Sequence, residues 1–136
     1  MKYIQEYKRA GEPTESAPYY LCKEAYQSLA IWRFKSLEDM HRRINQEIQD
    51  IDRIEYRAID EDGTIKAMMI LQVWENEPHT GFDTLITRFS FSSVNGLLTN
   101  GYRFMIKCAK TLKLNMICFS RHEGPLKISH VFKYLK

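Results

Sequence analysis

Residues 53–74 read RIEYRAIDEDGTIKAMMILQVW, and this stretch decides the fold class. Apolar side chains recur at every second position over 53–59 and again over 64–74, which is the period of a β-strand. Between these runs, residues 60–63 have the composition of a tight turn, in which Gly63 can adopt a positive φ. The stretch therefore predicts a β-hairpin.

The segments on both sides of this hairpin extend it into an α+β domain. Helical spacing returns on each side, and Ser36 is a good N-cap with Asp39 three residues later. The further predicted elements are, in chain order, a strand over 1–7, helices over 19–34 and 36–51, a third meander strand over 82–91, a long helix over 96–114, a buried parallel strand over 116–120 and a last helix over 126–135.

Length and composition are typical of one globular domain spanning residues 1–136. The 136 residues are 44% hydrophobic, enough for one core. Cys22, Cys108 and Cys118 form no CxxC motif, and the four histidines have no metal-ligand spacing, so we expect neither a disulfide framework nor a metal. With no signal core and no apolar run long enough for a membrane, we expect a reducing, cytoplasmic location.

Positive charge is concentrated in the last third of the chain. Residues 100–136 hold eight basic side chains and one acidic one, a net +7, whereas the first 99 residues carry a net −4. Such a segment could meet an anionic partner: a phosphate-bearing cofactor, an acidic protein or, with less support because no nucleic-acid-binding motif is present, DNA or RNA. It could equally be a solvated helix face. The sequence predicts no oligomeric state.

The predicted element order, β-α-α-β-β-β-α-β-α, resembles that of the GNAT superfamily of N-acetyltransferases over nearly the whole chain. The resemblance implies a mixed, mainly antiparallel sheet flanked by helices, with acetyl-coenzyme A as cosubstrate. The fold also recurs in small phage proteins, which would place the chain in the host cytoplasm or the virion.

In this family, a loop of pattern (Q/R)-x-x-G-x-(G/A) enters the long helix and holds the cofactor pyrophosphate on backbone N–H groups. Here Gly96 matches the central glycine, whereas Ser93 and Leu98 depart from the pattern. Arg103 and Lys107 on the following helix would meet the 3′-phosphate. The matching segment, predicted to bind the cofactor, is Ser93, Val94, Asn95, Gly96, Leu97 and Leu98.

The catalytic positions of the family are matched less well. The tyrosine that often acts as general acid corresponds to Phe132, and Tyr134 follows two residues later. The family often takes its base from the strands, where Glu55, Glu75, Glu77 and His79 are the candidates. Our predicted catalytic residues are Glu75, Glu77 and Tyr134. Arg121-His122-Glu123 follows the parallel strand, at the end where ligands collect in parallel sheets.

Three functions remain open on this sequence. The first is a GNAT-like domain with a degenerate acyl-coenzyme A site, acting mainly as a binding or structural protein. The second is an active acetyl-coenzyme A-dependent N-acyltransferase, because attack by an amine needs positioning more than side-chain chemistry. The third is a small nucleic-acid or host-protein binder that uses the basic last third.

Overall fold

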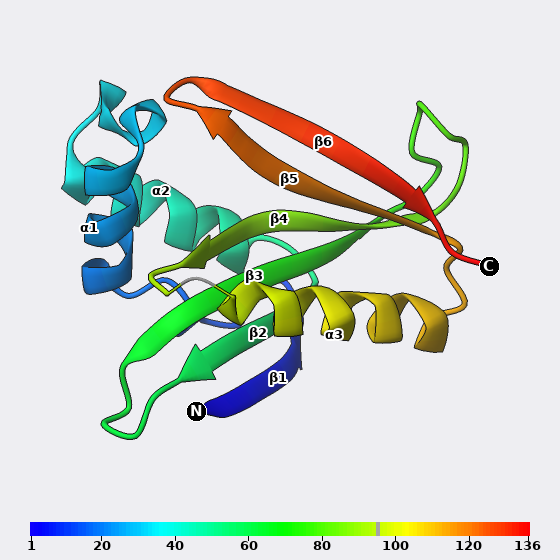
Figure 1. The fold of residues 1–136 in the computed structure, drawn as a ribbon, viewed down its shortest axis with the longest axis horizontal. Coiled ribbons are helices and arrows are strands. Elements are labelled where there is room, and N and C mark those ends of the chain that lie inside the picture. Colours follow the sequence, from blue (N-terminus) through cyan, green and yellow to red (C-terminus); the bar gives the residue numbers. More distant parts are fainter. Residues whose placement is uncertain (95) are drawn as a thin grey trace.

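Six strands form one sheet at the centre of the computed structural model, which describes residues 1–94 and 96–136 (Figure 1). The elements are, in chain order, β1 (Lys2–Lys8), α1 (Tyr19–Ser28), the 3-10 helix η1 (Ala30–Phe34), α2 (Leu37–Gln49), β2 (Arg53–Ile59), β3 (Ile65–Trp74), β4 (Thr84–Ser92), α3 (Leu97–Thr111), β5 (Met116–Gly124) and β6 (Lys127–Tyr134). The strands lie in the sheet in the order of the chain, and all neighbours are antiparallel except β4 and β5. The predicted mixed, mainly antiparallel sheet is confirmed.

Helices cover both faces of the sheet. Parallel strands need a crossover, and α3 supplies the one between β4 and β5 on one face, while α1 and α2 cover the other (Figure 1). Strand β3 feeds both cores: Met68 and Ile70 pack towards α1 and α2, and Met69 and Leu71 towards α3. Burial on both faces explains why β3 is an almost continuous apolar run.

Helix α2 begins where the sequence predicts. The side-chain Oγ of Ser36 accepts a hydrogen bond from the backbone N of Asp39 at 3.1 Å, which confirms the predicted N-cap. The buried stripe of the helix is Met40, Ile44 and Ile48.

The last element is the main error of the sequence-based prediction. Residues 126–135 were expected to form a helix, but they form strand β6, antiparallel to β5. Strand β5 runs on to Gly124, and the chain then turns back, so that β6 covers an edge of β5 that would otherwise be unpaired. Tertiary pairing thus overrides the weak local helical preference of this short segment.

A second correction concerns the first helix, predicted over 19–34. Helix α1 ends at Ser28 because Leu29 is extended (φ −131°), and the chain continues as the 3-10 helix η1. The remaining elements agree with prediction within a few residues, except that β5 is longer than expected.

Candidate functional site

Strands β4 and β5 separate after a short paired segment. They pair only through residues 84–86 and 116–118, and a last link runs from the backbone N of Ser120 to Oγ1 of Thr87 at 3.1 Å. At this point β4 carries a bulge: Phe89 pairs with Ile70 and Thr87 with Leu71, which leaves Arg88 without a partner on β3. A bulge bends its strand and increases its twist. The rest of β4 therefore leaves the plane that it shares with β5.

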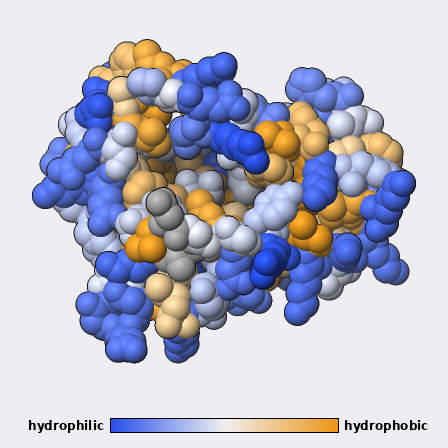
Figure 2. Space-filling view, viewed as in Figure 1, coloured by the Kyte–Doolittle hydropathy of each residue, from blue (hydrophilic) through white to orange (hydrophobic). Residues whose placement is uncertain are grey.

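A cavity of about 300 Å³ lies where the two strands diverge. Leu21 of α1, Trp32 of η1 and Met40 of α2 line one wall, while Phe89 and Phe91 of β4 line another. Figure 2 shows the molecule hollowed between the α1–α2 layer and β5–β6, with hydrophobic residues inside a largely hydrophilic rim.

The polar groups of this cavity come from β4, which contributes Thr87, Arg88 and Ser90, and from β5 and β6. Ser120 and His122 lie on one face of β5, and His130 is the partner of Ser120 on β6, with Ser120 Oγ 3.3 Å from His130 Nδ1. His122 is exposed at the rim of the cavity, and its partial burial lowers its pKa below the ordinary value, so this imidazole is neutral at neutral pH and can accept a proton. Cys22 also lines the cavity, but burial raises its pKa to about 11, which excludes a reactive thiolate.

Helix α3 begins at the same end of the sheet, directly after β4 (Figure 1). Its N-cap, Gly96, is left-handed (φ 89°), offers no side-chain cap and is followed by no acidic residue in the first turn. The backbone N of Thr99 donates to the carbonyl oxygen of Gly96 at 3.2 Å, and a helix N-terminus without a side-chain cap favours an anion. Leu98 packs against the hydrophobic core between α3 and the sheet. Asn95 lies outside the described residues, as does the side chain of Leu97.

Ser93 is already engaged within the protein. Its backbone N and its Oγ both donate to the carbonyl oxygen of Lys66, at 2.8 and 3.1 Å. Val94 is held by its backbone N–H to Ser92 Oγ at 3.2 Å. Hydrogen bonds to the end of β4 and to its neighbour β3 therefore hold the segment before α3. Of the positions that define the family pattern, Gly96 is the one that matches.

The three predicted catalytic residues lie at the opposite end of the sheet. Glu75 and Glu77 belong to the β3–β4 connection, and Tyr134 pairs with Met116 where β4 and β5 are still joined. The buried carboxylate of Glu77 accepts hydrogen bonds from the backbone N of Thr80 at 3.0 Å and from that of His79, so it stabilises its own turn. The structure does not bring these residues to the cavity, and their catalytic role stays a prediction.

Two further predicted cofactor-binding residues lie on the exposed face of α3. Arg103 and Lys107 are one turn apart, opposite the buried stripe of Gly101, Met105 and Ala109. Arg103 is roughly 10 Å along the helix axis from Gly96. A long arginine side chain there could reach a phosphate near the start of the helix, whereas Lys107 lies a further turn away.

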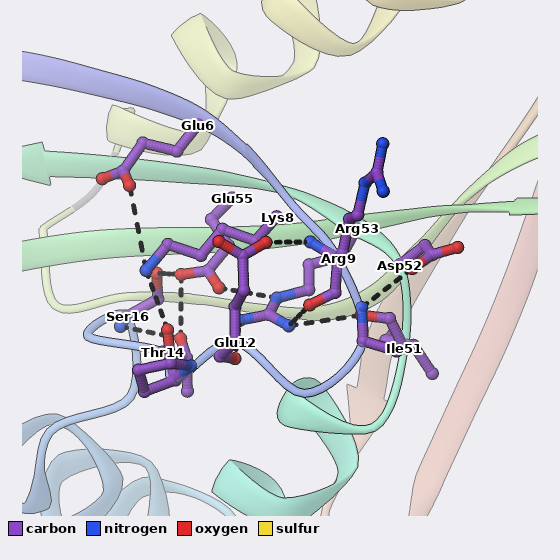
Figure 3. A network of polar contacts seen from close by, with 12 residues as sticks. Glu6, Lys8, Arg9, Glu12, Thr14, Ser16, Ile51, Asp52, Arg53 and Glu55 are labelled. Atoms are coloured by element: carbon purple, nitrogen blue, oxygen red, sulfur yellow. Dashed lines mark hydrogen bonds and ion pairs between the residues drawn. The ribbon is translucent and has the colours of Figure 1, made fainter.

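A buried polar network holds the chain that leads into α1 (Figure 3). Glu55 accepts hydrogen bonds from Ser16 Oγ, from Thr14 Oγ1 at 2.8 Å and from Arg53 Nε at 2.8 Å. Ser16 is followed by Ala17, which lines the cavity. Glu55, a candidate base in the sequence, is therefore a structural residue that helps to position the α1 wall.

Sequence reasoning missed the polar set Ser120, His122 and His130 as a unit. Arg121-His122-Glu123 was singled out only for its position after the parallel strand. The missing signal was the alternation of Ile128, His130 and Phe132, which marks residues 127–134 as a strand and places His130 beside β5. Within residues 1–94 and 96–136, no three His, Cys, Asp or Glu side chains are grouped to hold a metal ion, and no helix is long and apolar enough to cross a membrane.

Comparison with solved structures finds acetyltransferases, although no protein-family model and no curated protein matches the sequence. An assigned acetyltransferase from Pyrococcus furiosus superimposes with a TM-score of 0.64 at 14% identity, covering 91% of this chain and 86% of that one. One from Exiguobacterium sp. 255-15 gives 0.57 at 13% identity, covering 98% and 94%. AAC(6')-Iy, in complex with the bisubstrate analog CoA-S-monomethyl-acetylneamine, gives 0.53 at 10% identity, covering 90% and 82%.

Likeness at such low identity establishes the fold and not the activity. The crossover by α3 between β4 and β5 agrees with the element order on which the sequence resemblance rested, whereas the last element of that order, β6, is a strand and not the predicted helix. This chain has the GNAT acetyltransferase fold.

Proposed function

We propose that this protein binds an acyl-coenzyme A at the end of the sheet where β4 and β5 diverge and transfers the acyl group to an amine held in the cavity. The observation that carries the proposal is the juxtaposition of three features at one end of the sheet. They are the uncapped N-terminus of α3, the unpaired part of β4 and a largely apolar cavity that His122 lines.

The residues present fit an acyl-coenzyme A. The amide groups that follow Gly96 are not capped by a side chain, and the positive end of the helix dipole favours a phosphate there. Arg103 would meet a further phosphate from the first turns of α3. Beyond Ile86, the edge of β4 that faces β5 has no ladder partner in the described residues, so its backbone groups can bind an extended ligand. Acyl-coenzyme A supplies an activated thioester carbonyl.

The transfer itself can be written with the residues of the cavity. The amine nitrogen forms a bond to the thioester carbonyl carbon, the carbon–sulfur bond breaks, and one amide and one free thiol result. The proton that the amine loses is taken by the neutral imidazole of His122, and the thiolate recovers a proton from solvent or from His122. Most of the rate would come from holding the two reactants together, and the base would add to it.

A second candidate is an acyl-coenzyme A-binding domain without turnover, and the state of Ser93 favours it. Ser93 stands where the family pattern has a basic or amide side chain. Its backbone N–H and its hydroxyl both donate to the carbonyl oxygen of Lys66. Fewer donors would then face the cofactor, which would weaken the anion site and leave a binding or structural protein. An origin in a phage stays a prediction.

Two measurements on the same preparation separate these candidates. Calorimetry and thermal unfolding with acetyl-coenzyme A test binding: at 100 times Kd, the ligand should raise the free energy of unfolding by about 2.7 kcal/mol. Colorimetric detection of the released thiol, with a panel of primary amines, tests transfer. Binding with amine-dependent thiol release supports the enzyme, and binding without release supports the second candidate. No stabilisation at millimolar acetyl-coenzyme A would reject both.

A further inference from the structure

We propose that the acyl acceptor is a small apolar monoamine, with an aliphatic or one-ring body. The wall of the cavity, which has no carboxylate among its described residues, would select this amine against diamines and polyamines. The inference rests on the proposed transfer function and names its substrate class. It depends on the walls of the cavity, on the charges near them and on the protonation of an amine placed inside.

The walls of the cavity offer apolar contact on several sides. Leu21, Ala25 and Met40 are buried, and Trp32 and Phe89 pack against the same core. An aliphatic or aromatic body placed there removes apolar surface from water, which stabilises binding by about 25 cal/mol for each Å². The volume of about 300 Å³ is at the lower end for small-molecule sites, so the body must be short.

The charges around the cavity argue against a second ammonium group. Among the described lining residues no carboxylate occurs, and the charged side chain of Arg88 is paired with Glu47 of α2. The other polar groups there, such as Ser120, His122 and His130, carry no negative charge. A second ammonium would be desolvated without an anionic partner, and burying an unpaired charge is costly.

The same walls help the single reacting amine. An amine attacks only as the neutral base, and desolvation disfavours the ammonium form, so an apolar cavity lowers the pKa of a bound amine. The nitrogen therefore enters the reaction with less help from a strong base. When it attacks the thioester carbonyl carbon, the carbon–sulfur bond breaks and His122 takes the proton, as in the proposed transfer. A site for polyamines would need carboxylates, which hold the ammonium form instead.

A matched pair of acceptors tests the inference. Hexylamine and 1,6-diaminohexane have the same chain and differ by one terminal ammonium. After acetyl-coenzyme A binding has been confirmed by calorimetry, thiol release should give a kcat/KM for hexylamine higher than for the diamine by at least about 10-fold. Equal values, or a higher value for the diamine, would overturn the inference while leaving the transfer function intact. Absence of acetyl-coenzyme A binding would overturn the function and the inference together.

A substitution at the rim tests the physical cause. Ile128 of β6 lines the cavity and is 40% exposed, so a polar residue there is compatible with folding. Ile128→Glu should raise the ratio of kcat/KM for the diamine to that for hexylamine by roughly 10-fold, because it supplies the missing anion. Ile128→Gln has the same shape without the charge and should leave this ratio near the wild-type value. A ratio that moves equally in both variants would reject selection by charge.

Discussion

The side-chain Nε of Arg53 donates to Oε2 of Glu55 at 2.8 Å, and both side chains are fully buried. Neither charge is left alone. Arg53 also donates to the carbonyl oxygens of Arg9 and Glu12, and the other oxygen of Glu55 accepts from Thr14 and Ser16 (Figure 3). The pair thereby connects β2 to the loop that leads into α1.

Glu55→Gln should destabilise the protein strongly. The substitution removes the negative charge and leaves the buried guanidinium of Arg53 uncompensated, which typically costs about 3–5 kcal/mol. Urea denaturation followed by circular dichroism measures this loss. Glu61→Gln, in the exposed β2–β3 turn, is the matched control and should change the free energy of unfolding by less than about 0.5 kcal/mol. A loss below about 1 kcal/mol in Glu55→Gln would contradict the role of the pair.

The same carboxylate makes stability depend on pH. Burial alone would raise the pKa of Glu55, but hydrogen bonds from Ser16, Arg53 and Thr14 and the charge of Arg53 outweigh burial, so the net pKa is lowered. A lowered folded-state pKa stabilises the protein above the unfolded value of about 4.3, and this contribution is lost as pH falls through the folded-state value. Between pH 7 and pH 3, the free energy of unfolding measured with urea should fall more steeply in wild type than in Glu55→Gln. Parallel curves would show that other carboxylates account for the acid loss.

His122→Gln should reduce thiol release by about 10²-fold or more if the imidazole is the general base. A base must be neutral to act, and the pKa of His122 lies below its ordinary value. The wild-type rate should therefore fall on the acid side with a midpoint below about 6.5, and this limb should be absent in the variant. His79→Gln, at the other end of the sheet, is the control. It should keep the wild-type rate of thiol release and the fall of that rate at acid pH. Persistence of the acid limb in His122→Gln would identify another base.

Gly96→Ala should weaken acetyl-coenzyme A binding in addition to its effect on folding. Gly96 and Gly63 have nearly the same left-handed φ, 89° and 87°, and an added Cβ would meet nothing within 4 Å at either position. Alanine at each position should therefore cost a similar backbone strain, about 1 kcal/mol by thermal unfolding. Only the Gly96 variant should lose affinity in calorimetry, because only that turn leads into α3. Equal affinities for the two variants would place the cofactor phosphates elsewhere.

Three lysines at the C-terminal end of α3 provide a test of the third function. Lys107 and Lys110 are exposed residues of α3, and the exposed Lys113 follows the end of the helix with a left-handed φ of 59°. If the protein binds DNA or RNA through them, replacing all three with Gln should reduce the slope of log affinity against log salt by about 2–3. The measurement is fluorescence anisotropy with labelled oligonucleotides across salt concentrations. An unchanged slope would reject these three lysines as a nucleic-acid contact.

Local patterns were enough to predict most of the fold. The alternation over residues 53–74, the Ser36 cap and the return of helical spacing after Gly96 each depend on neighbours in sequence, and each element is present in the structure. The long helix between two strands also predicts a parallel pair, because a crossover of that length permits one.

The sequence predicted the candidate site much less well than the fold. The residue types of Glu75, Glu77 and Tyr134 made them plausible candidates. They lie at the end of the sheet where β4 and β5 are still paired, away from the cavity. His130 was unrecognised because its segment was interpreted as a helix, and only pairing with β5 places it beside Ser120. A helix is stabilised by contacts within one segment, whereas a strand needs a partner that sequence spacing does not identify.

The sequence by itself thus determined the elements from β1 to β5 in their order, apart from the break in the first helix, and the glycine at the start of α3, since these follow from periodicity and backbone preference. The tertiary structure alone decided the bulge at Arg88, the divergence of β4 from β5 and the cavity between them. It also decided that β6 is a strand, because the unpaired edge of β5 offers residues 127–134 backbone hydrogen bonds that an isolated segment cannot form.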